Sequence, residues 1–298
     1  MTTRLSYAII TPYRDEAENL RRLAPCLVSQ TATPAAWVVL DDGSSDDSGA
    51  FVTRLAAEHP WVRPVSSGGG ALARGAPIVR AFHRGLALLD PMPDVVVKLD
   101  ADISMGPDHF EQLLREFGRN PRLGIAGGIG YEEQADGSWR QRHGTGEAVW
   151  GACRAYRREC LDHILPLEEH MGWDTLDLMK ANVKGWETRV FYDLSFRHHR
   201  GEGERDGNRL RTTTIQGEAA HYMGYRIPYL VLRTLYRLLR DPAAIGLLVG
   251  YVRARVRRAP RCADRELVDY VRRQQSFRSL PARMREARRA REVLVDSP

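Results

Sequence analysis

Two aspartates one residue apart, Asp100 and Asp102, follow the apolar run 95–99. Such a run is typical of a strand that is buried on both faces, so both carboxylates lie where the strand ends. Like charges this close repel each other and resist desolvation, unless they are solvated or a cation lies between them. The pair could therefore hold Mg²⁺ or Mn²⁺, which bind oxygen ligands and can bridge a diphosphate. The alternative is that both residues cap a helix that begins near Pro107.

A second acidic strand end occurs in "VVLDDGSSDDS", where Asp41 and Asp42 follow an apolar run. Gly43 relaxes the turn, and Ser44 or Ser45 can cap the following helix. A carboxylate here can accept hydrogen bonds from a base imide or a ribose hydroxyl. The alternative, an ordinary N-cap turn, explains the serines better than it explains two consecutive aspartates.

The segments around these motifs alternate between strand and helix patterns. Strands are predicted at 7–11, 36–42, 62–67 and 94–100, and helices at 18–30, 48–59 and 76–89. Strands separated by helices predict a parallel sheet with right-handed crossovers. The loops "TPYRDE", "DDGSSDDS" and "DADISM" each follow a strand's carboxyl end, so we expect them to converge on the rim where ligands bind in such sheets.

The pattern of apolar and charged residues in the rest of the chain changes near Gly207. Before it, the pattern predicts a helix at 107–120, a strand at 123–133, a mixed segment at 148–164, a helix at 175–185 and a strand at 187–199. After it, helical patterns carry apolar residues three and four apart between arginines. We find no internal repeat.

Composition allows one large α/β domain or a domain with an appendage, because 298 residues with 43% hydrophobic content can bury a real core. No run of about 18 apolar residues and no signal-peptide pattern occurs, which favours a soluble, cytoplasmic body. Four cysteines lack the spacing of a metal site or a disulfide framework, so we expect reduced thiols.

The net charge of +6 is uneven, since the chain from His221 onward has 18 arginines and seven acidic residues. This basic tail has no nucleic-acid-binding motif, so we expect no nucleic acid partner. Amphipathic helices at 229–241 and 243–258 would suit anionic lipid headgroups at the inner face of the plasma membrane. The alternative is that they pack on the catalytic domain or on a second subunit.

Three segments together carry a resemblance. "IITPYRDEAENL", "VVLDDGSSDDS" and "VVVKLDAD", in this order, resemble the nucleotide-sugar-binding half of inverting family 2 glycosyltransferases of the bacterial polysaccharide biosynthesis type, over about residues 5–200. The resemblance implies a GT-A fold, an α/β Rossmann-like three-layer sandwich at 1–206, followed by a basic helical extension at 207–298. It also implies sugar transfer from a nucleoside diphosphate donor, with UDP favoured, to a hydroxyl of a saccharide or lipid-linked acceptor.

The resemblance also assigns roles to single residues in the donor site. Thr11, Pro12 and Glu16 would line the nucleoside pocket, and Asp42 would bind the base with support from Asp41. Asp100 would approach the ribose or the metal, Asp102 would be the principal metal ligand, and His198 or His199 in "FRHHRGEG" would complete the metal shell.

The acceptor side carries one departure from the family pattern. An inverting transferase needs a general base, which the family usually supplies from an acidic pair that opens a helix. The matching segment "HMGWDTLDLMKANVKGW" has Trp173 where a glutamate is expected, so Asp174 becomes the predicted base, with Asp177 in reserve. Asp174 could alternatively be only a helix N-cap.

Two further segments could contribute to the site. "SSGGGALARGAPIVR" is typical of a phosphate cradle, with Arg74 or Arg80 supplying charge, or of a flexible loop before a helix. Trp150 and Gly151 lie in a segment that resembles the corresponding family segment. They would form the floor of the sugar or acceptor pocket together with Trp173, although Trp150 could equally be an ordinary core residue.

Two rival functions remain open from the sequence. A sugar-phosphate nucleotidylyltransferase would have its glycine-rich loop directly after the first strand, where this chain has "TPYRDE". A catalytically silent sugar-nucleotide-binding or assembly subunit is favoured by the missing acidic residue at Trp173 and disfavoured by the intact Asp100 and Asp102 pair.

Overall fold

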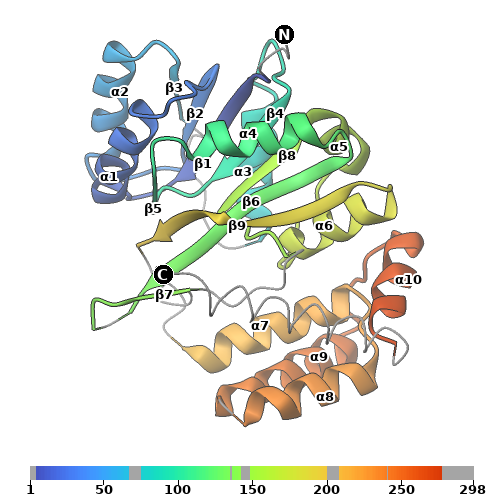
Figure 1. The fold of residues 1–298 in the computed structure, drawn as a ribbon. Helices are drawn as coiled ribbons and strands as arrows, with labels where there is room; N and C mark the ends of the chain where they lie inside the picture. Colours follow the sequence, from blue (N-terminus) through green and yellow to red (C-terminus); the bar gives the residue numbers. More distant parts are fainter. Residues whose placement is uncertain are drawn as a thin grey trace.

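The computed structural model describes residues 5–66, 75–134, 136–141, 148–199, 208–239 and 241–276. Its strands are β1 (Tyr7–Tyr13), β2 (Ala36–Asp41), β3 (Val62–Ser66), β4 (Val95–Leu99), β5 (Ile103–Met105), β6 (Leu123–Glu133), β7 (Trp139–Gln141), β8 (Cys153–Arg157) and β9 (Glu187–His198). Its α-helices are α1 (Ala17–Val28), α2 (Ser48–Glu58), α3 (Ala76–Leu86), α4 (His109–Arg119), α5 (Arg158–Ile164), α6 (Trp173–Val183), α7 (Arg209–Tyr222), α8 (Ile227–Leu238), α9 (Gly246–Val256) and α10 (Arg265–Gln274) (Figure 1).

One mixed sheet forms the centre of the molecule, in the order β3-β2-β1-β4-β8-β6-β9-β5, with β7 paired to β6. The first four strands are parallel, as the alternating pattern predicts. From β8 onward the sheet is mixed, because β8 runs antiparallel to both β4 and β6. The short strands β5 and β7 were not predicted, since three residues carry too little pattern to detect.

Helices cover both faces of this sheet, which makes the three layers that the family resemblance implies. Successive residues of the buried strands point to opposite faces, so Ile9 and Val97 pack with α1, α2 and α4, whereas Ile10 and Val96 pack with α3, α5 and α6. The strands are apolar throughout because both of their faces are covered. Figure 1 shows α4 in front of the sheet and α6 below it.

The helices α7 to α10 form a separate group at the bottom of Figure 1, and their apolar core includes Leu176 of α6. Helices α7 and α9 are in backbone contact, because a Cβ atom added to Gly250 would lie 1.9 Å from the Thr214 carbonyl oxygen. Only glycine allows this approach, so the position of α7 is fixed tightly. The predicted boundary at 206/207 lies outside the described residues, as does the chain beyond 276.

Candidate active site

The two aspartates of the first motif lie beside a histidine from a distant part of the sequence. Asp100 directly follows β4, Asp102 directly precedes β5, and His198 ends β9. Because β5 and β9 pair with Ile103 opposite His198, the imidazole lies beside the aspartates. One ligand atom from each of the three residues lies within 4.8 Å of the others, and His198 Nε2 is 3.3 Å from Asp102 Oδ1.

The charged groups of this cluster shift one another's pKa values. Burial raises the pKa of Asp100, and the charge of Asp102 adds to this rise, whereas Lys98 opposes it. Burial alone would lower the pKa of His198, but the hydrogen bond and charge of Asp102 raise it overall. The His198 Nδ1 atom is buried and has no hydrogen-bond partner among the described residues.

Lys98 is a member of the site that the sequence analysis did not single out. Its side chain is buried, and Nζ donates to Asp100 Oδ1 and, at 2.8 Å, to the Gly151 carbonyl. A lysine inside the apolar strand 95–99 was the available signal, because a buried ammonium needs a partner.

The donor set of this cluster fits a divalent cation. Two partly desolvated carboxylates and an imidazole provide hard oxygen and borderline nitrogen ligands, the kind that Mg²⁺ or Mn²⁺ accepts. The alternative role for the aspartates does not hold, because α4 begins at His109 and its N-cap is Asp108. His199 differs from His198, since its Nε2 lies 2.7 Å from Ser104 Oγ and it is not a member of the cluster.

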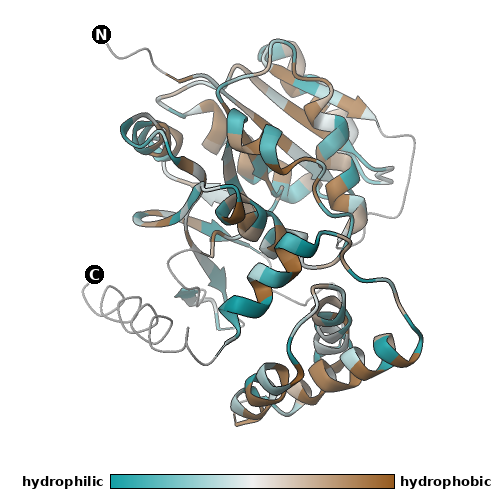
Figure 2. Cartoon of the chain, turned by 90° about the vertical axis from the view of Figure 1, so that its right-hand side faces the viewer, coloured by the Kyte–Doolittle hydropathy of each residue, from teal (hydrophilic) through white to brown (hydrophobic). Residues whose placement is uncertain are grey.

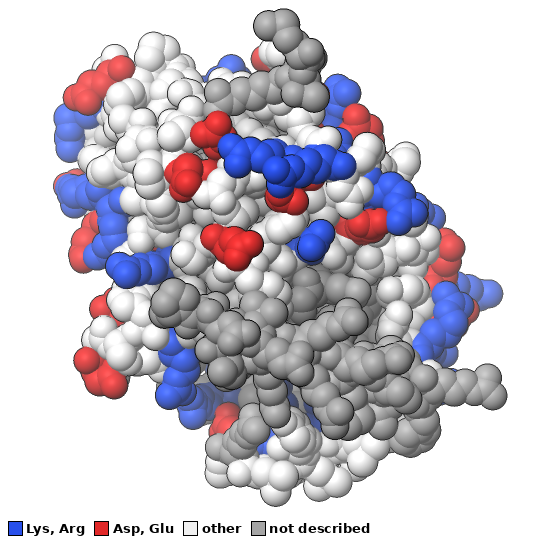
Figure 3. Space-filling view, in the orientation of Figure 1, with Lys and Arg blue, Asp and Glu red and all other residues white. Residues whose placement is uncertain are grey.

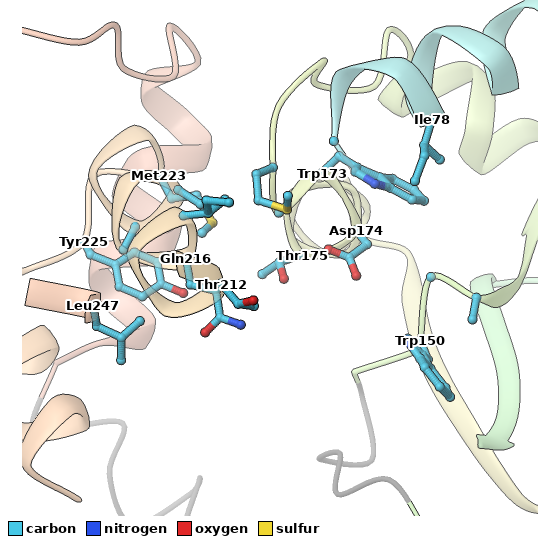
Figure 4. Close-up of a pocket in the computed structure, with 18 of the residues that line it drawn as sticks. Ile78, Trp150, Trp173, Asp174, Thr175, Thr212, Gln216, Met223, Tyr225 and Leu247 are labelled. Carbon is cyan, nitrogen blue, oxygen red and sulfur yellow. The ribbon is translucent and has the colours of Figure 1, made fainter. Parts of the chain in front are cut away.

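A cavity of about 400 Å³ connects this cluster with α6 and the C-terminal helices. Asp100, His198 and Gly151 line this cavity. Figure 4 shows Trp150, Trp173 and Asp174 on the side of the cavity opposite Gln216 and Leu247 of the C-terminal helices. A Cβ atom added to Gly151, in the turn before β8, would lie 3.2 Å from Asp174 Cβ, so glycine eases the close packing of this turn against α6.

Asp174 lies on the cavity wall as the second residue of α6. The N-cap of this helix is Gly172, whose φ of 85° suits glycine, and so Asp174 is not the N-cap. Figure 4 shows its carboxylate beside Thr175 and facing the open part of the cavity. Asp174 is therefore placed to reach a bound molecule.

Asp177 differs from its expected role as a reserve base, because it is 1% exposed and does not line the cavity. Its carboxylate accepts hydrogen bonds from Arg154 Nη1, Tyr156 Oη and the Leu178 amide. Burial alone would lower the pKa of Arg154, but Asp177 raises it, so the guanidinium stays charged. This buried pair joins β8 to α6 and positions the helix that carries Asp174.

We expect Asp177→Asn to destabilise the fold by about 3–5 kcal/mol, because it leaves the buried Arg154 charge without its counter-ion. The free energy of unfolding in urea measures this loss. Asp174→Asn, three residues earlier on the same helix, is the matched control and should unfold close to the wild type. Equal stability of the Asp177→Asn variant and the wild type would contradict the role of the pair.

The loops "TPYRDE" and "DDGSSDDS" are joined by hydrogen bonds, as their predicted common position at the rim of the sheet requires. Asp15 Oδ1 accepts hydrogen bonds from the amides of Ser45 at 2.6 Å and Asp46 at 3.2 Å, and these bonds lower the pKa of Asp15. Asp41 Oδ1 accepts from the Ser44 amide at 2.8 Å, and both Asp41 and Asp42 are partly exposed. The N-cap of α2 is Asp47, so neither Ser44 nor Ser45 caps this helix.

Other predicted nucleotide-binding residues have different positions. Thr11 is fully buried, and its Oγ1 accepts a hydrogen bond from Trp37 Nε1 at 2.9 Å, so it supports the sheet from within the core. Pro12 and Glu16 are also buried, and Glu16 Oε2 accepts from Asn19 at 2.6 Å. Arg80 is exposed, and its guanidinium pairs with the Glu169 carboxylate at 3.0 Å. This ion pair does not support the expected phosphate-binding role. Arg74 lies outside the described residues.

Comparison with known proteins decides the family. The model for "Glycosyl transferase family 2" matches residues 8–166, which is more than half of the chain. The chain belongs to this family. This membership agrees with the resemblance that the three sequence motifs carry, and the match includes most of β1, all of β2 and β4, and both aspartates of the Asp100, Asp102 and His198 cluster.

Two curated relatives of this family 2 glycosyltransferase are polysaccharide synthases. A chondroitin synthase of Pasteurella multocida (strain Pm70) and a hyaluronan synthase of Pasteurella multocida are each 24% identical over 131 residues. These matches cover 44% of this chain and only 13% of the length of each relative.

Solved structures show that this glycosyltransferase has the GT-A fold. A mannosyltransferase from Pyrobaculum calidifontis in complex with GDP-Man and Mn²⁺ has a TM-score of 0.59 and 15% identity, covering 99% of this chain and 87% of that one. GalNAc-T7 with UDP, GalNAc and Mn²⁺ has a TM-score of 0.55 and 15% identity, covering 67% and 44%. TarS of S. aureus with UDP has a TM-score of 0.52 and 14% identity, covering 72% and 64%.

Proposed function

We propose that this glycosyltransferase moves one sugar from a nucleoside diphosphate donor, with UDP favoured, to a hydroxyl of a saccharide or lipid-linked acceptor, with inversion. The observation that carries the proposal is the single cavity that joins the Asp100, Asp102 and His198 cluster to Asp174. Inversion needs a base on the side of the sugar opposite the leaving diphosphate, and Asp174 is a carboxylate that lines the same cavity. Structures of similar fold contain UDP or GDP-Man with Mn²⁺, which supports the donor class.

Different residues of the cavity would act on the donor and on the acceptor. Asp100, Asp102 and His198 would hold Mg²⁺ or Mn²⁺, which when bound would offset the charge of the departing diphosphate. Lys98 holds Asp100 in place and links it to the Gly151 backbone. Asp174 accepts the proton of the attacking hydroxyl, and the rings of Trp150 and Trp173 provide apolar walls for the sugars.

The pathway is the synthesis of a polysaccharide or cell-envelope glycan. The support is the likeness to two relatives that are named for polysaccharides, chondroitin and hyaluronan. The test of the reaction is the release of nucleoside diphosphate from UDP-sugars and GDP-mannose, with and without saccharide acceptors. Nucleotide binding without any turnover would instead support a catalytically silent binding subunit.

The helices α8 and α9 present an apolar surface that supports a membrane-facing role. Seven apolar residues each expose 50% or more of their surface: Leu232, Leu235 and Tyr236 on α8, Leu239 at its C-cap, and Val249, Val252 and Val256 on α9; this set is named the apolar face. Figure 2 shows hydrophobic stretches on the helices at the bottom of the molecule, and the described atoms at the bottom of Figure 3 include a white, uncharged group.

The charges beside the apolar face favour an anionic lipid surface. Residues 225–262 contain nine arginines and one acidic residue, Asp241. Arg226 at the N-cap of α8 and Arg255, Arg257 and Arg258 at the end of α9 are exposed. Among the described residues, none of the helices combines the length and the hydropathy that crossing a bilayer requires. The proposal is therefore peripheral association with the inner face of the plasma membrane, where a lipid-linked acceptor would be available.

We expect the protein to sediment with vesicles of phosphatidylglycerol and phosphatidylcholine, and the variant Leu235→Gln with Val252→Gln to bind at least about tenfold more weakly. Leu88→Gln is the matched control, because Leu88 is 45% exposed outside the apolar face. Undiminished vesicle binding of the double variant would contradict the proposal, and a concentration-dependent dimer that it abolishes would assign the face to a second copy of the chain.

A further inference from the structure

The end of the cavity away from Asp100 is formed by the C-terminal helices, outside the matched family segment 8–166. These helices add several polar side chains to the wall, namely Thr212, Gln216, Tyr225, Arg233 and Arg237. Figure 4 shows Thr212 and Gln216 of α7 on the side of the cavity that faces Thr175 and Asp174. One wall of the cavity therefore carries the proposed base, and the facing wall carries two arginines.

Each of the two arginines contacts another residue of the cavity wall. Arg237 Nη1 donates to Gln216 Oε1 at 3.0 Å, and the guanidinium carbon of Arg233 lies 5.9 Å from the centre of the Tyr225 ring. Both arginines are half-buried and lie four residues apart, so they are neighbours on one face of α8. Among the described residues that line the cavity, the carboxylates are Asp100, which is bonded to Lys98, and Asp174.

Helix α8 is positioned rigidly behind these arginines. Leu230 and Thr234, which precede and follow Arg233 on α8, are fully buried, and Thr234 Oγ1 donates to the Leu230 carbonyl at 2.8 Å. The Tyr251 hydroxyl of α9 donates to the Tyr225 carbonyl at 3.2 Å, which fixes the turn before α8. A positive end of the cavity is thus built into the packing of the helices.

We propose that Arg233 and Arg237 bind a negatively charged group of the acceptor, either a phosphate or a carboxylate. This inference rests on the proposed function, in which the donor diphosphate occupies the Asp100 end and Asp174 lies between donor and acceptor. Guanidinium groups bind phosphate and carboxylate oxygens through paired, charge-assisted hydrogen bonds. The arginines therefore select the acceptor and take no part in the proton transfer.

The test is calorimetric titration of the protein, saturated with UDP and Mn²⁺, with three probes: glucose 1-phosphate, glucuronate and glucose. Since the donor end is then occupied, the probes report on the acceptor end. We expect at least one anionic probe to bind about tenfold or more tightly than glucose, and Arg233→Gln to remove this preference without changing the affinity for UDP. The stronger of the two anionic probes identifies phosphate or carboxylate as the group that is recognised.

Arg253→Gln is the matched control, because Arg253 is exposed on α9, pairs with Glu218 at 3.7 Å and does not line the cavity. It removes the same charge from the C-terminal helices and should keep the preference. Equal binding of all three probes, or an unchanged preference in the Arg233→Gln variant, would overturn the inference while UDP binding leaves the proposed function standing. Absence of UDP binding to the wild type would overturn both.

Discussion

Replacing Asp102 with asparagine is expected to lower the transfer rate by more than about a thousandfold while the protein stays folded. Asp102 is buried and contacts His198, so its loss removes one of two carboxylates from the cluster that fits a divalent cation. A cation beside a departing diphosphate stabilises the transition state by several kcal/mol, which corresponds to this factor. Release of nucleoside diphosphate, measured across a range of Mn²⁺ concentrations, gives the rate.

The matched control for this variant is Asp108→Asn. Asp108 is exposed and is the N-cap of α4, six residues after Asp102, and it lies outside the cluster. The control should retain wild-type turnover and the same dependence on Mn²⁺. If Asp102→Asn kept wild-type turnover, the carboxylate would have no part in holding a cation.

Replacing Asp174 with asparagine is expected to reduce kcat by about 10²–10⁴, the range for removal of a general base. Asparagine has nearly the same shape but cannot accept the proton of the attacking hydroxyl. The donor site is separate from Asp174, so the affinity for the nucleotide should not change. Steady-state kinetics together with nucleotide titration measure these two quantities.

Asp162→Asn, on the exposed side of α5, controls for the loss of one surface carboxylate and should leave kcat unchanged. Rescue of turnover in the Asp174→Asn variant at high pH, where the acceptor hydroxyl ionises more readily, would agree with its role as a base. Full activity of Asp174→Asn at neutral pH would show that another group accepts the proton.

Local patterns in the sequence were sufficient for most of the sheet. The apolar runs that became β1, β2 and β4 are continuous because both faces of the sheet are covered, and each ends in a polar loop at the rim. The run 123–133 was predicted with the bounds that β6 has. The pairing of β5 with β9, which brings His198 to Asp102, could not be predicted, because it joins residues about 95 positions apart through a three-residue strand.

Side-chain direction accounts for most of the differences within the site. Thr11 and Asp177 carry the right chemistry at the right place in the chain, but alternation along β1 and the turn of α6 direct them into the core. The Arg80 side chain is directed to the protein surface, where it pairs with Glu169. The C-terminal wall of the cavity was also beyond prediction, since an amphipathic pattern shows that a helix packs but does not show against which surface.

Calorimetric titration of UDP, GDP and dTDP, with and without Mn²⁺, tests the central claim most directly. On wild-type protein we predict that one nucleotide, with UDP favoured, binds tightly only when Mn²⁺ is present, and that Asp102→Asn loses this dependence. Absence of binding by all three nucleotides in every condition would contradict the assignment of a nucleotide-sugar site to the rim that carries Asp100, Asp102 and His198.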